Sequence, residues 1–473
     1  MIKKIYYLLI LIFSIISIYL GFNSTIIPNI VLYIIIAFYL INLIILYLLI
    51  AKKRRKGKKR KICTILGIIL SIILIIINIL LVFIYIKSNS FFNKITNTDY
   101  ERTTYSLIVL KDTNYKYITD LNTIGLYHNE LDKNYDAGLK KITDKVNISE
   151  KEYTNILVMI SDLLNKSIDG IFINEIYIDI ISESKEDFED YINVIDTINI
   201  DSLINDNNTE IDITKLKSFN LYISGLDKAS GINNVSRSDV NVIATVNMET
   251  GKILLTNTPR DYYVQLHGTT GLKDKLSHAG VHGVEMSLKT LEDLYDIKID
   301  YYIRVNFNSL IKVVDTIGGI DVYSDRSFVG ANNVYFNKGW NHMNGERALA
   351  YSRTRKAYET GDRHRGQNQQ QVIEAIFQKI TKSNNLMYYL NLFNALEDSF
   401  QTNIDKQSIN SLINFQVKNN YKWEFEMISV DGDGMYTYFY TYPDFYDYAM
   451  EPYYDTVETA KKRINEVLNE SKK

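Results

Sequence analysis

VNVIATVNMETGKILLTNTPRD, residues 240–261, predicts two β-strands joined by a tight turn at Glu249 to Gly251. FNLYISGLD at 219–227 predicts a third strand before this pair, and YYIRVNF at 301–307 predicts a fourth after it. Helices are expected at residues 284–295, 309–317, 345–350, 367–380 and 456–468. Strands that alternate with helices predict an α/β fold in which helices cover both faces of a central sheet.

A smaller α/β domain is predicted ahead of this region, over residues 103–213. Strands are expected at 105–111 and 170–181, and amphipathic helices at 153–164 and 185–195. Residues 196–212 are polar and rich in Asn and Asp, which is typical of a boundary. The larger domain is therefore expected to occupy residues 214–473.

Three apolar runs, at residues 5–20, 30–50 and 62–86, predict three membrane spans within residues 1–87. The loop KKRRKGKKRK at 52–61 is strongly basic, and positive loops stay in the cytoplasm. Everything after Lys87 is then expected outside the cell. The sequence predicts a multi-pass protein of the cytoplasmic membrane, with a polar linker at 88–102 and an extracellular catalytic domain.

Composition excludes several classes of protein. A net charge of −2 over 473 residues does not indicate a nucleic-acid binder, so no nucleic-acid partner is expected. The single cysteine, Cys63, excludes a disulfide within the chain and a cysteine-based metal site. Walker, GxSxG and GxGxxG motifs are lacking, which disfavours nucleotide hydrolases, serine hydrolases and dinucleotide enzymes.

Arginine is concentrated in two short stretches of a chain otherwise rich in lysine. TPRD at 258–261 contains Arg260, and SRTRKAYETGDRHRGQNQQQ at 352–371 contains the other four candidates, Arg353, Arg355, Arg363 and Arg365. Arginine offers a planar fork of donors that binds phosphate oxygens in pairs. This pattern predicts a clamp for a polyphosphate, although a solvated loop of salt bridges is the alternative.

The local geometry of the second stretch is also predictable. An extended SRTR segment would point Arg353 and Arg355 to one side. Asp362, Arg363 and Arg365 are expected in a loop, followed by a helix whose first turn holds Gln369 and favours an anion.

Two aspartates are candidate metal ligands. Asp227 ends one predicted strand and Asp239 precedes the next, so neighbouring strands would bring both carboxylates to one sheet edge. Paired carboxylates beside a phosphate suit Mg²⁺, whereas turn capping is the alternative. His278 and His282 have helical zinc-ligand spacing, but no third ligand is evident.

Taken together, these motifs resemble the LytR–CpsA–Psr (LCP) family of cell-envelope proteins. The matching stretches follow the family order and are GLD at 225–227, SRSDVNVIATVN at 236–247, GKILLTNTPRD at 251–261, KLSHAG at 275–280, VNFNSLIKVVDTIGGIDV at 305–322, GERALAYSRTRK at 345–356 and GDRHRGQNQQQVI at 361–373. Three spans and a preceding accessory domain resemble the capsule-linked branch of that family. The resemblance implies a membrane-anchored α/β/α sandwich.

The resemblance also implies a function. Family members are thought to transfer a glycopolymer, such as capsular polysaccharide or teichoic acid, from an undecaprenyl-pyrophosphate carrier to peptidoglycan. This chain is therefore expected to be a Mg²⁺-dependent phosphotransferase, with Mn²⁺ as a possible substitute. Its expected partners are the lipid-linked glycan, peptidoglycan and the cytoplasmic membrane.

Site residues carry over position by position. Asp227 and Asp239 match the metal-binding aspartates, and Gln369 matches a glutamine of the pyrophosphate clamp. The matching arginines are Arg260, Arg353, Arg355 and Arg365. Asp261, Lys275 and Arg363 occupy family-typical positions, with Asp261 as a candidate base and the other two as candidate substrate ligands. Asn368 departs from the pattern, since many members carry a second arginine just before the glutamine.

Two other functions use the same features. Water in place of the sugar hydroxyl would make the protein a polyprenyl-pyrophosphate phosphatase. A non-enzymatic envelope-lipid sensor or transcriptional attenuator is the second alternative, although the cytoplasmic segments are short.

Overall fold

The computed structural model describes most of the chain, and several short segments lie outside the described residues. The described residues are 2–22, 29–51, 58–96, 100–144, 146–184, 187–204, 213, 216–226, 231–355, 357, 362–382, 392, 399–419 and 421–471.

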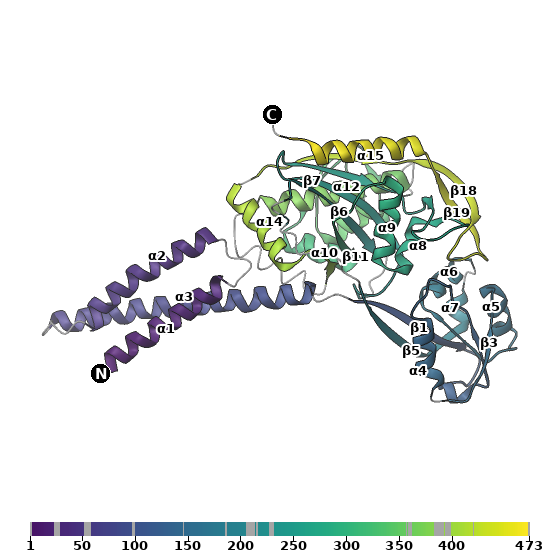
Figure 1. The fold of residues 1–473 in the computed structure, drawn as a ribbon, viewed down its shortest axis with the longest axis horizontal. Coiled ribbons are helices and arrows are strands. Elements are labelled where there is room, and N and C mark those ends of the chain that lie inside the picture. The colour runs from purple at the N-terminus through teal and green to yellow at the C-terminus, as the bar shows by residue number, and fades with distance from the viewer. Residues whose placement is uncertain are drawn as a thin grey trace.

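Six described strands form the central sheet, in the order β16-β11-β6-β7-β8-β17 (Figure 1). The β6–β7 and β7–β8 pairs are antiparallel, whereas β11 and β17 run parallel to β6 and β8. The strands are β6 (Ser218–Leu226), β7 (Ser238–Asn247), β8 (Lys252–Asn257), β11 (Tyr301–Asn306), β16 (Phe400–Thr402) and β17 (Glu424–Ser429). The predicted strand pair thus lies in the middle of the sheet, as β7 and β8.

Side chains of β7 alternate between two hydrophobic cores, because successive residues of a strand point to opposite faces. Val242 and Ala244 pack with residues of α12 and α14. Ile243 points the other way and packs with residues of α9 and α15. A strand buried on both faces explains the near-continuous apolar run in its sequence.

Helices cover both faces of this sheet, and the resulting three layers are the predicted α/β/α sandwich (Figure 1). The helices are α9 (Val284–Tyr295), α10 (Phe307–Thr316), α11 (Gly345–Arg353), α12 (Asp362–Thr381), α14 (Lys406–Asn419) and α15 (Tyr454–Asn469). The five helices predicted for this region are all present; α9 has the predicted boundaries, and those of the other four differ by a few residues. α12 differs most, since it begins at Asp362 rather than at residue 367.

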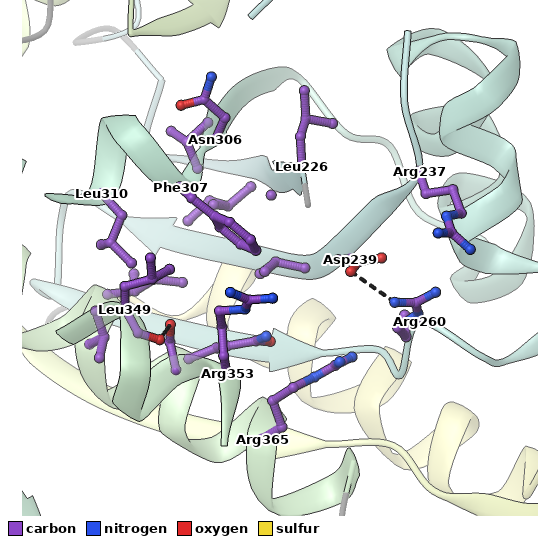
Figure 2. Close-up of a pocket in the computed structure, with 18 of the residues that line it drawn as sticks. Leu226, Arg237, Asp239, Arg260, Asn306, Phe307, Leu310, Leu349, Arg353 and Arg365 are labelled. Atoms are coloured by element: carbon purple, nitrogen blue, oxygen red, sulfur yellow. Dashed lines mark hydrogen bonds and ion pairs between the residues drawn. The ribbon is translucent and has the colours of Figure 1, made fainter. Parts of the chain in front are cut away.

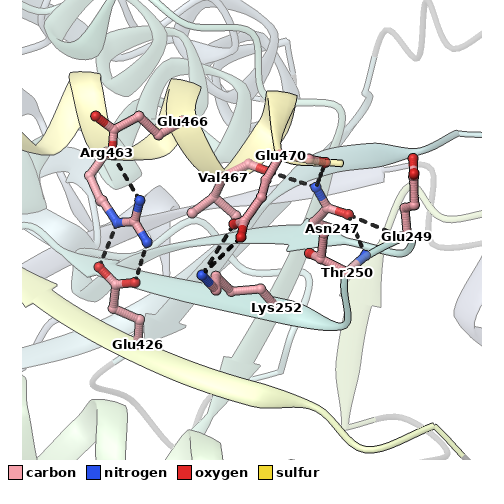
Figure 3. A network of polar contacts seen from close by, with 9 residues as sticks. All are labelled: Asn247, Glu249, Thr250, Lys252, Glu426, Arg463, Glu466, Val467 and Glu470. Carbon is pink, nitrogen blue, oxygen red and sulfur yellow. Dashed lines mark hydrogen bonds and ion pairs between the residues drawn. The ribbon is translucent and has the colours of Figure 1, made fainter. Parts of the chain in front are cut away.

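One buried amide joins the central turn to the C-terminal helix (Figure 3). Asn247 Nδ2 donates to the carbonyl oxygens of Val467 and Glu470, at 2.7 and 2.9 Å. Its Oδ1 accepts the backbone N–H groups of Glu249 and Thr250, at 3.0 and 2.9 Å. The same side chain therefore closes the β7–β8 turn and satisfies carbonyls at the end of α15.

The accessory part forms a second sheet, in the order β3-β2-β4-β1-β5. Its strands are β1 (Tyr100–Leu110), β2 (Thr123–Leu126), β3 (Ser149–Glu152), β4 (Gly170–Asn174) and β5 (Ile192–Leu203), and its helices are α4 (Tyr135–Thr143), α5 (Ile156–Leu164), α6 (Ile176–Ser184) and α7 (Phe188–Tyr191). A small α/β unit was expected here, and the structure has one.

Three local predictions in this unit were wrong. The apolar run 170–181 is a strand only to Asn174, and α6 begins two residues later. Residues 185–195 do not form one helix: α7 is short, and β5 then pairs with β1 along its whole length. Since β5 extends to Leu203, the expected boundary at 196–212 begins too early. Residues 205–212 lie outside the described residues.

Three N-terminal helices are long and apolar enough to cross a membrane, by length and composition. They are α1 (Ile2–Phe22), α2 (Asn29–Leu46) and α3 (Lys58–Thr96). A buried polar network joins all three: Tyr39 donates to Asn78 Oδ1 at 3.0 Å, and Asn78 Nδ2 donates to Ser14 Oγ at 3.2 Å. Residues 52–57 of the basic loop lie outside the described residues.

The polar linker expected at 88–102 is largely structured. α3 continues to Thr96 and β1 begins at Tyr100. Residues 88–96 contain neither Gly nor Pro, so nothing in the sequence stops the helix.

A buried ion pair links the two sheets. Arg304 on β11 is almost inaccessible, and its NH1 donates to Glu101 Oε1 on β1 at 2.6 Å. The same carboxylate oxygen accepts the backbone N–H of Val284, the first residue of α9, at 2.8 Å. One carboxylate thus pairs with an arginine and satisfies a helix N-terminus.

Candidate functional site

A cavity of about 440 Å³ opens between the central sheet and helices α10, α11 and α12 (Figure 2). Its lining has two parts that differ in chemistry, and Figure 2 shows Leu310 and Leu349 on the side away from Arg237, Asp239 and Arg260. The apolar part consists of Ile223, Val240, Val305, Leu310, Leu349, Val372 and Ile373. The other is polar and is lined by Arg237, Asp239, Arg260, Arg353, Arg355, Arg365 and Gln369.

The polar end combines five arginines with one carboxylate among the described lining residues. Such an excess of positive charge favours an anionic ligand, and the low exposure of several of these groups strengthens each charged interaction. An apolar interior behind this mouth suits a ligand that has a charged head and a hydrocarbon tail.

Arg260 and Asp239 form the most buried ion pair of the polar end. Arg260 follows β8, Asp239 is the second residue of β7, and NH1 lies 2.8 Å from Oδ2. Asp261 holds the other side of the guanidinium, with its Oδ1 3.4 Å from Nε. The two carboxylates therefore fix the orientation of Arg260. Asp261 is not among the residues that line the cavity.

The second oxygen of Asp239 is suited to a cation. Oδ1 is buried without a hydrogen-bond partner among the described residues. Carboxylate oxygens are preferred ligands of Mg²⁺. Asp227 lies outside the described residues, but β6 ends at Leu226 opposite Ser238. β6 and β7 are therefore neighbours in the sheet, as the prediction of a joint metal site required.

No cluster of three or more His, Cys, Asp or Glu ligands occurs in the described part of the chain. A metal here would need the substrate's own oxygens to complete its ligand set. Asp239 with Asp227 fits that requirement, and the Mg²⁺ assignment stays a prediction.

Arg353 and Arg355 lie at the end of α11. Arg353 is the last residue of the helix and Thr354 is its extended cap, so the segment is extended only from Thr354 and not over the whole of SRTR. Both arginines are exposed, Thr354 between them is buried, and both line the cavity. The Arg353 guanidinium lies over the Phe307 ring, 4.5 Å from its centre, a contact that orients the planar fork.

α12 presents Arg365 and Gln369 to the cavity from consecutive turns. The prediction of a loop at 362–365 was wrong, because the helix begins at Asp362, and Gln369 therefore lies beyond the first turn. Gly366 lets α12 approach β8 closely, since a Cβ there would clash with the side-chain amide of Asn257.

Two predicted substrate ligands lie away from the cavity lining. Lys275 is buried and pairs with Asp447, Nζ to Oδ2, at 2.6 Å. Although burial opposes the charge of Asp447, this hydrogen bond leaves its pKa below the ordinary value. Arg363 pairs with Asp431 on the opposite side of α12, where both line a separate polar cavity.

The remaining residues singled out from the sequence have structural partners. His278 Nδ1 lies 2.6 Å from Asp274 Oδ1, and His282 Nε2 lies 2.9 Å from Thr441 Oγ1. Neither histidine belongs to a cluster of three or more candidate metal ligands among the described residues. Asn368 is buried and donates to the Tyr351 carbonyl at 3.1 Å, away from the cavity lining.

The sequence analysis missed Arg237 and Phe307, which both line the cavity (Figure 2). Arg237 stands two residues before Asp239 in SRSD, so strand alternation could have indicated it. Phe307 gave no local signal, because its contact with Arg353 joins segments that are distant in the sequence.

Comparison with known proteins identifies the family. A profile of the LytR_cpsA_psr family matches residues 191–457. The polyisoprenyl-teichoic acid--peptidoglycan teichoic acid transferase TagU of Bacillus mycoides (strain KBAB4) is 33% identical over 226 residues, covering 47% of this chain and 71% of TagU. TagU of Bacillus subtilis (strain 168) is 35% identical over 196 residues, covering 41% of this chain and 63% of TagU.

Among solved structures, B. subtilis TagV has 27% identity and a TM-score of 0.45, covering 54% of this chain and 99% of that one. TagT bound to LIIa-WTA has 27% identity and a TM-score of 0.45, covering 55% of this chain and 94% of that one. The profile spans more than half of the chain and includes the whole cavity lining. The chain therefore belongs to the LytR_cpsA_psr family.

Proposed function

We propose that this protein transfers a glycopolymer from a polyprenyl-pyrophosphate carrier to peptidoglycan, outside the cytoplasmic membrane. The observation that carries the proposal is the cavity, which joins an arginine-lined mouth to an apolar interior. A pyrophosphate head and a polyprenyl tail match these two halves. The similarity to the TagU teichoic acid transferases supports the same reaction class.

The position of α12 supports a lipid substrate. Arg365 lies at the mouth, Val372 and Ile373 line the apolar end, and Ile380 packs against the cluster of the three N-terminal helices. One helix therefore connects the cavity to the region that is expected to sit in the bilayer.

The reaction we propose is the attack of an acceptor sugar hydroxyl on the phosphorus that carries the glycan. A new phosphodiester forms between glycan and acceptor, the pyrophosphate P–O bond breaks, and polyprenyl phosphate and a proton leave. The leaving phosphate gains negative charge as the bond breaks. Arg260, Arg353, Arg355 and Arg365 would stabilise that charge, and Gln369 would donate a hydrogen bond.

Asp239 and Asp227 would hold a Mg²⁺ ion, or a Mn²⁺ ion in its place, which supplies charge neutralisation for the bound diphosphate. Asp261 would act through Arg260, by fixing the guanidinium that faces the diphosphate. Which glycopolymer is carried, capsular polysaccharide or teichoic acid, depends on contacts beyond this clamp, and the capsule-linked branch remains our expectation.

The test uses the full-length protein in detergent with a polyprenyl-pyrophosphate disaccharide, a peptidoglycan fragment and Mg²⁺. The wild-type protein should form the coupled phosphodiester. Arg365→Ala should lose this product, whereas Arg326→Ala, a surface arginine paired with Asp325, should retain it. Phosphate release without coupled product would instead establish a phosphatase. Tight lipid binding with neither product would establish a sensor.

A further inference from the structure

An exposed cluster of tyrosines lies on one face of the C-terminal hairpin. β18 (Gly432–Tyr438) and β19 (Tyr446–Pro452) are antiparallel, and Tyr436 pairs with Tyr448 while Tyr438 pairs with Tyr446. Residues at these positions share one face of the pleated ribbon. We name Tyr436, Tyr438, Tyr446 and Tyr448 the tyrosine face.

The rings of the tyrosine face form a continuous surface. Ring centroids are 6.2 Å apart for Tyr436 and Tyr446, 6.0 Å for Tyr436 and Tyr448, and 5.1 Å for Tyr438 and Tyr446. Tyr436 and Tyr446 are each 62% exposed, and Tyr438 is 48% exposed. A contiguous exposed aromatic patch is unusual on a soluble domain and marks a binding surface.

The opposite face of the hairpin anchors it to the domain. Asp447 pairs with Lys275 at 2.6 Å, and Glu451 lies 3.7 Å from Lys273. The rings of the tyrosine face are therefore not required to hold the hairpin in place.

The root of the hairpin adjoins the arginine-lined mouth. The Met450 N–H donates to the Asp261 carbonyl oxygen at 2.7 Å, directly beside Arg260. Asp431, the residue before β18, pairs with Arg363 on the side of α12 away from this cavity. The Met450 contact thus connects the end of β19 to the segment that carries Arg260.

The hairpin and the membrane helices lie at opposite ends of the molecule (Figure 1). The tyrosine face is therefore remote from the bilayer, which argues against a lipid surface as its occupant. It is also uncharged, because the carboxylates of the hairpin, Asp433, Asp447 and Glu451, occupy the alternate positions of the two strands. A face without cations offers no charge to a phosphate-rich polymer and suits neutral sugar rings.

We propose that the tyrosine face binds pyranose rings of the peptidoglycan glycan strand and so holds the acceptor beside the clamp. The C–H bonds on the apolar face of a pyranose pack against aromatic rings, and phenolic hydroxyls can hydrogen-bond to sugar hydroxyls. Two ring positions along β18, Tyr436 and Tyr438, lie about 6.6–6.8 Å apart, as in any strand. The acceptor role rests on the proposed function, but the sugar contact does not.

The test measures binding of the full-length protein, in detergent micelles, to purified peptidoglycan sacculi stripped of attached polymers. The double variant Tyr436→Ala/Tyr446→Ala should bind roughly 5- to 150-fold more weakly, the loss expected for two aromatic contacts. Tyr436→Phe/Tyr446→Phe keeps both rings and should retain most of the affinity. The matched control, Tyr117→Ala/Tyr191→Ala, removes two exposed tyrosines of the accessory part and should bind as wild type.

Soluble β-1,4-linked N-acetylglucosamine oligomers should compete with sacculi for the wild-type protein and not for the alanine variant. Wild-type affinity in the folded alanine variant would overturn the proposal. The proposal would also be overturned if the alanine variant bound sacculi as well as the wild-type protein does and lost only its binding to phospholipid vesicles or its self-association. If the wild-type protein transfers no glycan yet binds sacculi through these rings, the transferase proposal fails and the sugar-binding proposal stands.

Discussion

At the scale of single residues, Arg353 shows how a charged group gains direction from its neighbours. Its guanidinium lies over the Phe307 ring, 4.5 Å from its centre, and faces the cavity, so the ring orients the donor fork. A lysine at this position would provide charge without that plane.

We predict that Arg353→Ala lowers kcat/KM for coupled-product formation by roughly 10- to 150-fold, because a charge-assisted contact contributes about 1.5–3 kcal/mol. Arg353→Lys should restore little of this loss. Steady-state kinetics of both variants provide the measurement. Full activity of the lysine variant would mean that bulk positive charge alone is needed.

His282 supplies a pH-dependent contribution to stability. Desolvation of its partly buried ring lowers its pKa from 6.5 to about 4. Between these values the unfolded chain binds a proton that the folded chain excludes, so stability falls as the pH drops from about 6.5 to about 4 and is unaffected above 6.5. Nearby titrating groups are His278 and Asp274.

We predict that the melting temperature of the wild-type protein falls more steeply between pH 7 and pH 5 than that of His282→Gln. The variant should be less stable at pH 7, because it has lost the contact with Thr441. Its melting temperature should, however, change less with pH. Thermal unfolding followed by circular dichroism at both pH values measures the two slopes. Parallel slopes would contradict the assignment.

At the scale of elements, Asn247 connects a turn, a strand and a helix with four hydrogen bonds. We predict that Asn247→Ala lowers the free energy of unfolding by about 2–4 kcal/mol, since it leaves several backbone groups without partners in a buried place. Chemical denaturation gives the value. Asn465→Ala removes an exposed side-chain bond within α15 and should change stability little.

At the scale of the whole molecule, Glu101 and Arg304 join the accessory sheet to the central one. Removing one partner of a buried ion pair leaves an uncompensated charge and costs about 3–5 kcal/mol. We predict that Glu101→Gln lowers the melting temperature and exposes the junction between the sheets to protease. Glu150→Gln, at an exposed position of β3, is the matched control.

The double variant Glu101→Leu/Arg304→Met should regain much of the stability lost in Glu101→Gln, because neither charge is then buried. Comparable loss in the single and double variants would indicate that the polar contacts of Glu101 with Val284 matter more than the ion pair.

Topology is the second prediction at this scale. The basic stretch 52–61 between the second and third spans predicts a cytoplasmic loop and an extracellular C-terminus. A phosphatase reporter fused after Lys473 should therefore be active, and a cytoplasmic reporter at the same place should be silent. The reverse pattern would contradict both the extracellular location and the proposed substrate.

The sequence by itself determined the features that depend on local periodicity and composition. Apolar runs of sufficient length located the three N-terminal helices that are long and apolar enough to cross a membrane, and the pattern of 240–257 located the two central strands. Val284 to Tyr295 was predicted to the residue as α9, because its apolar positions recur with helical spacing.

Local patterns failed where two structures suit the same residues. The run 170–181 is predominantly apolar, with polar residues only at 174, 175 and 179, so periodicity could not separate β4 from α6. Ile192 and Val194 are β-branched, and they pair with β1, which is far away in the sequence. This strand pairing outweighs the weak helical pattern of residues 185–195.

Only the tertiary structure decided which charged residues meet. Lys275 and Arg363 belong to the same motifs as the cavity arginines, yet each is paired with a carboxylate near the C-terminal end of the chain. Arg237 and Phe307 reach the cavity through a sheet order that does not follow the chain. Spacing along a sequence fixes the direction of a side chain on its own element, whereas its neighbours depend on how distant elements pack.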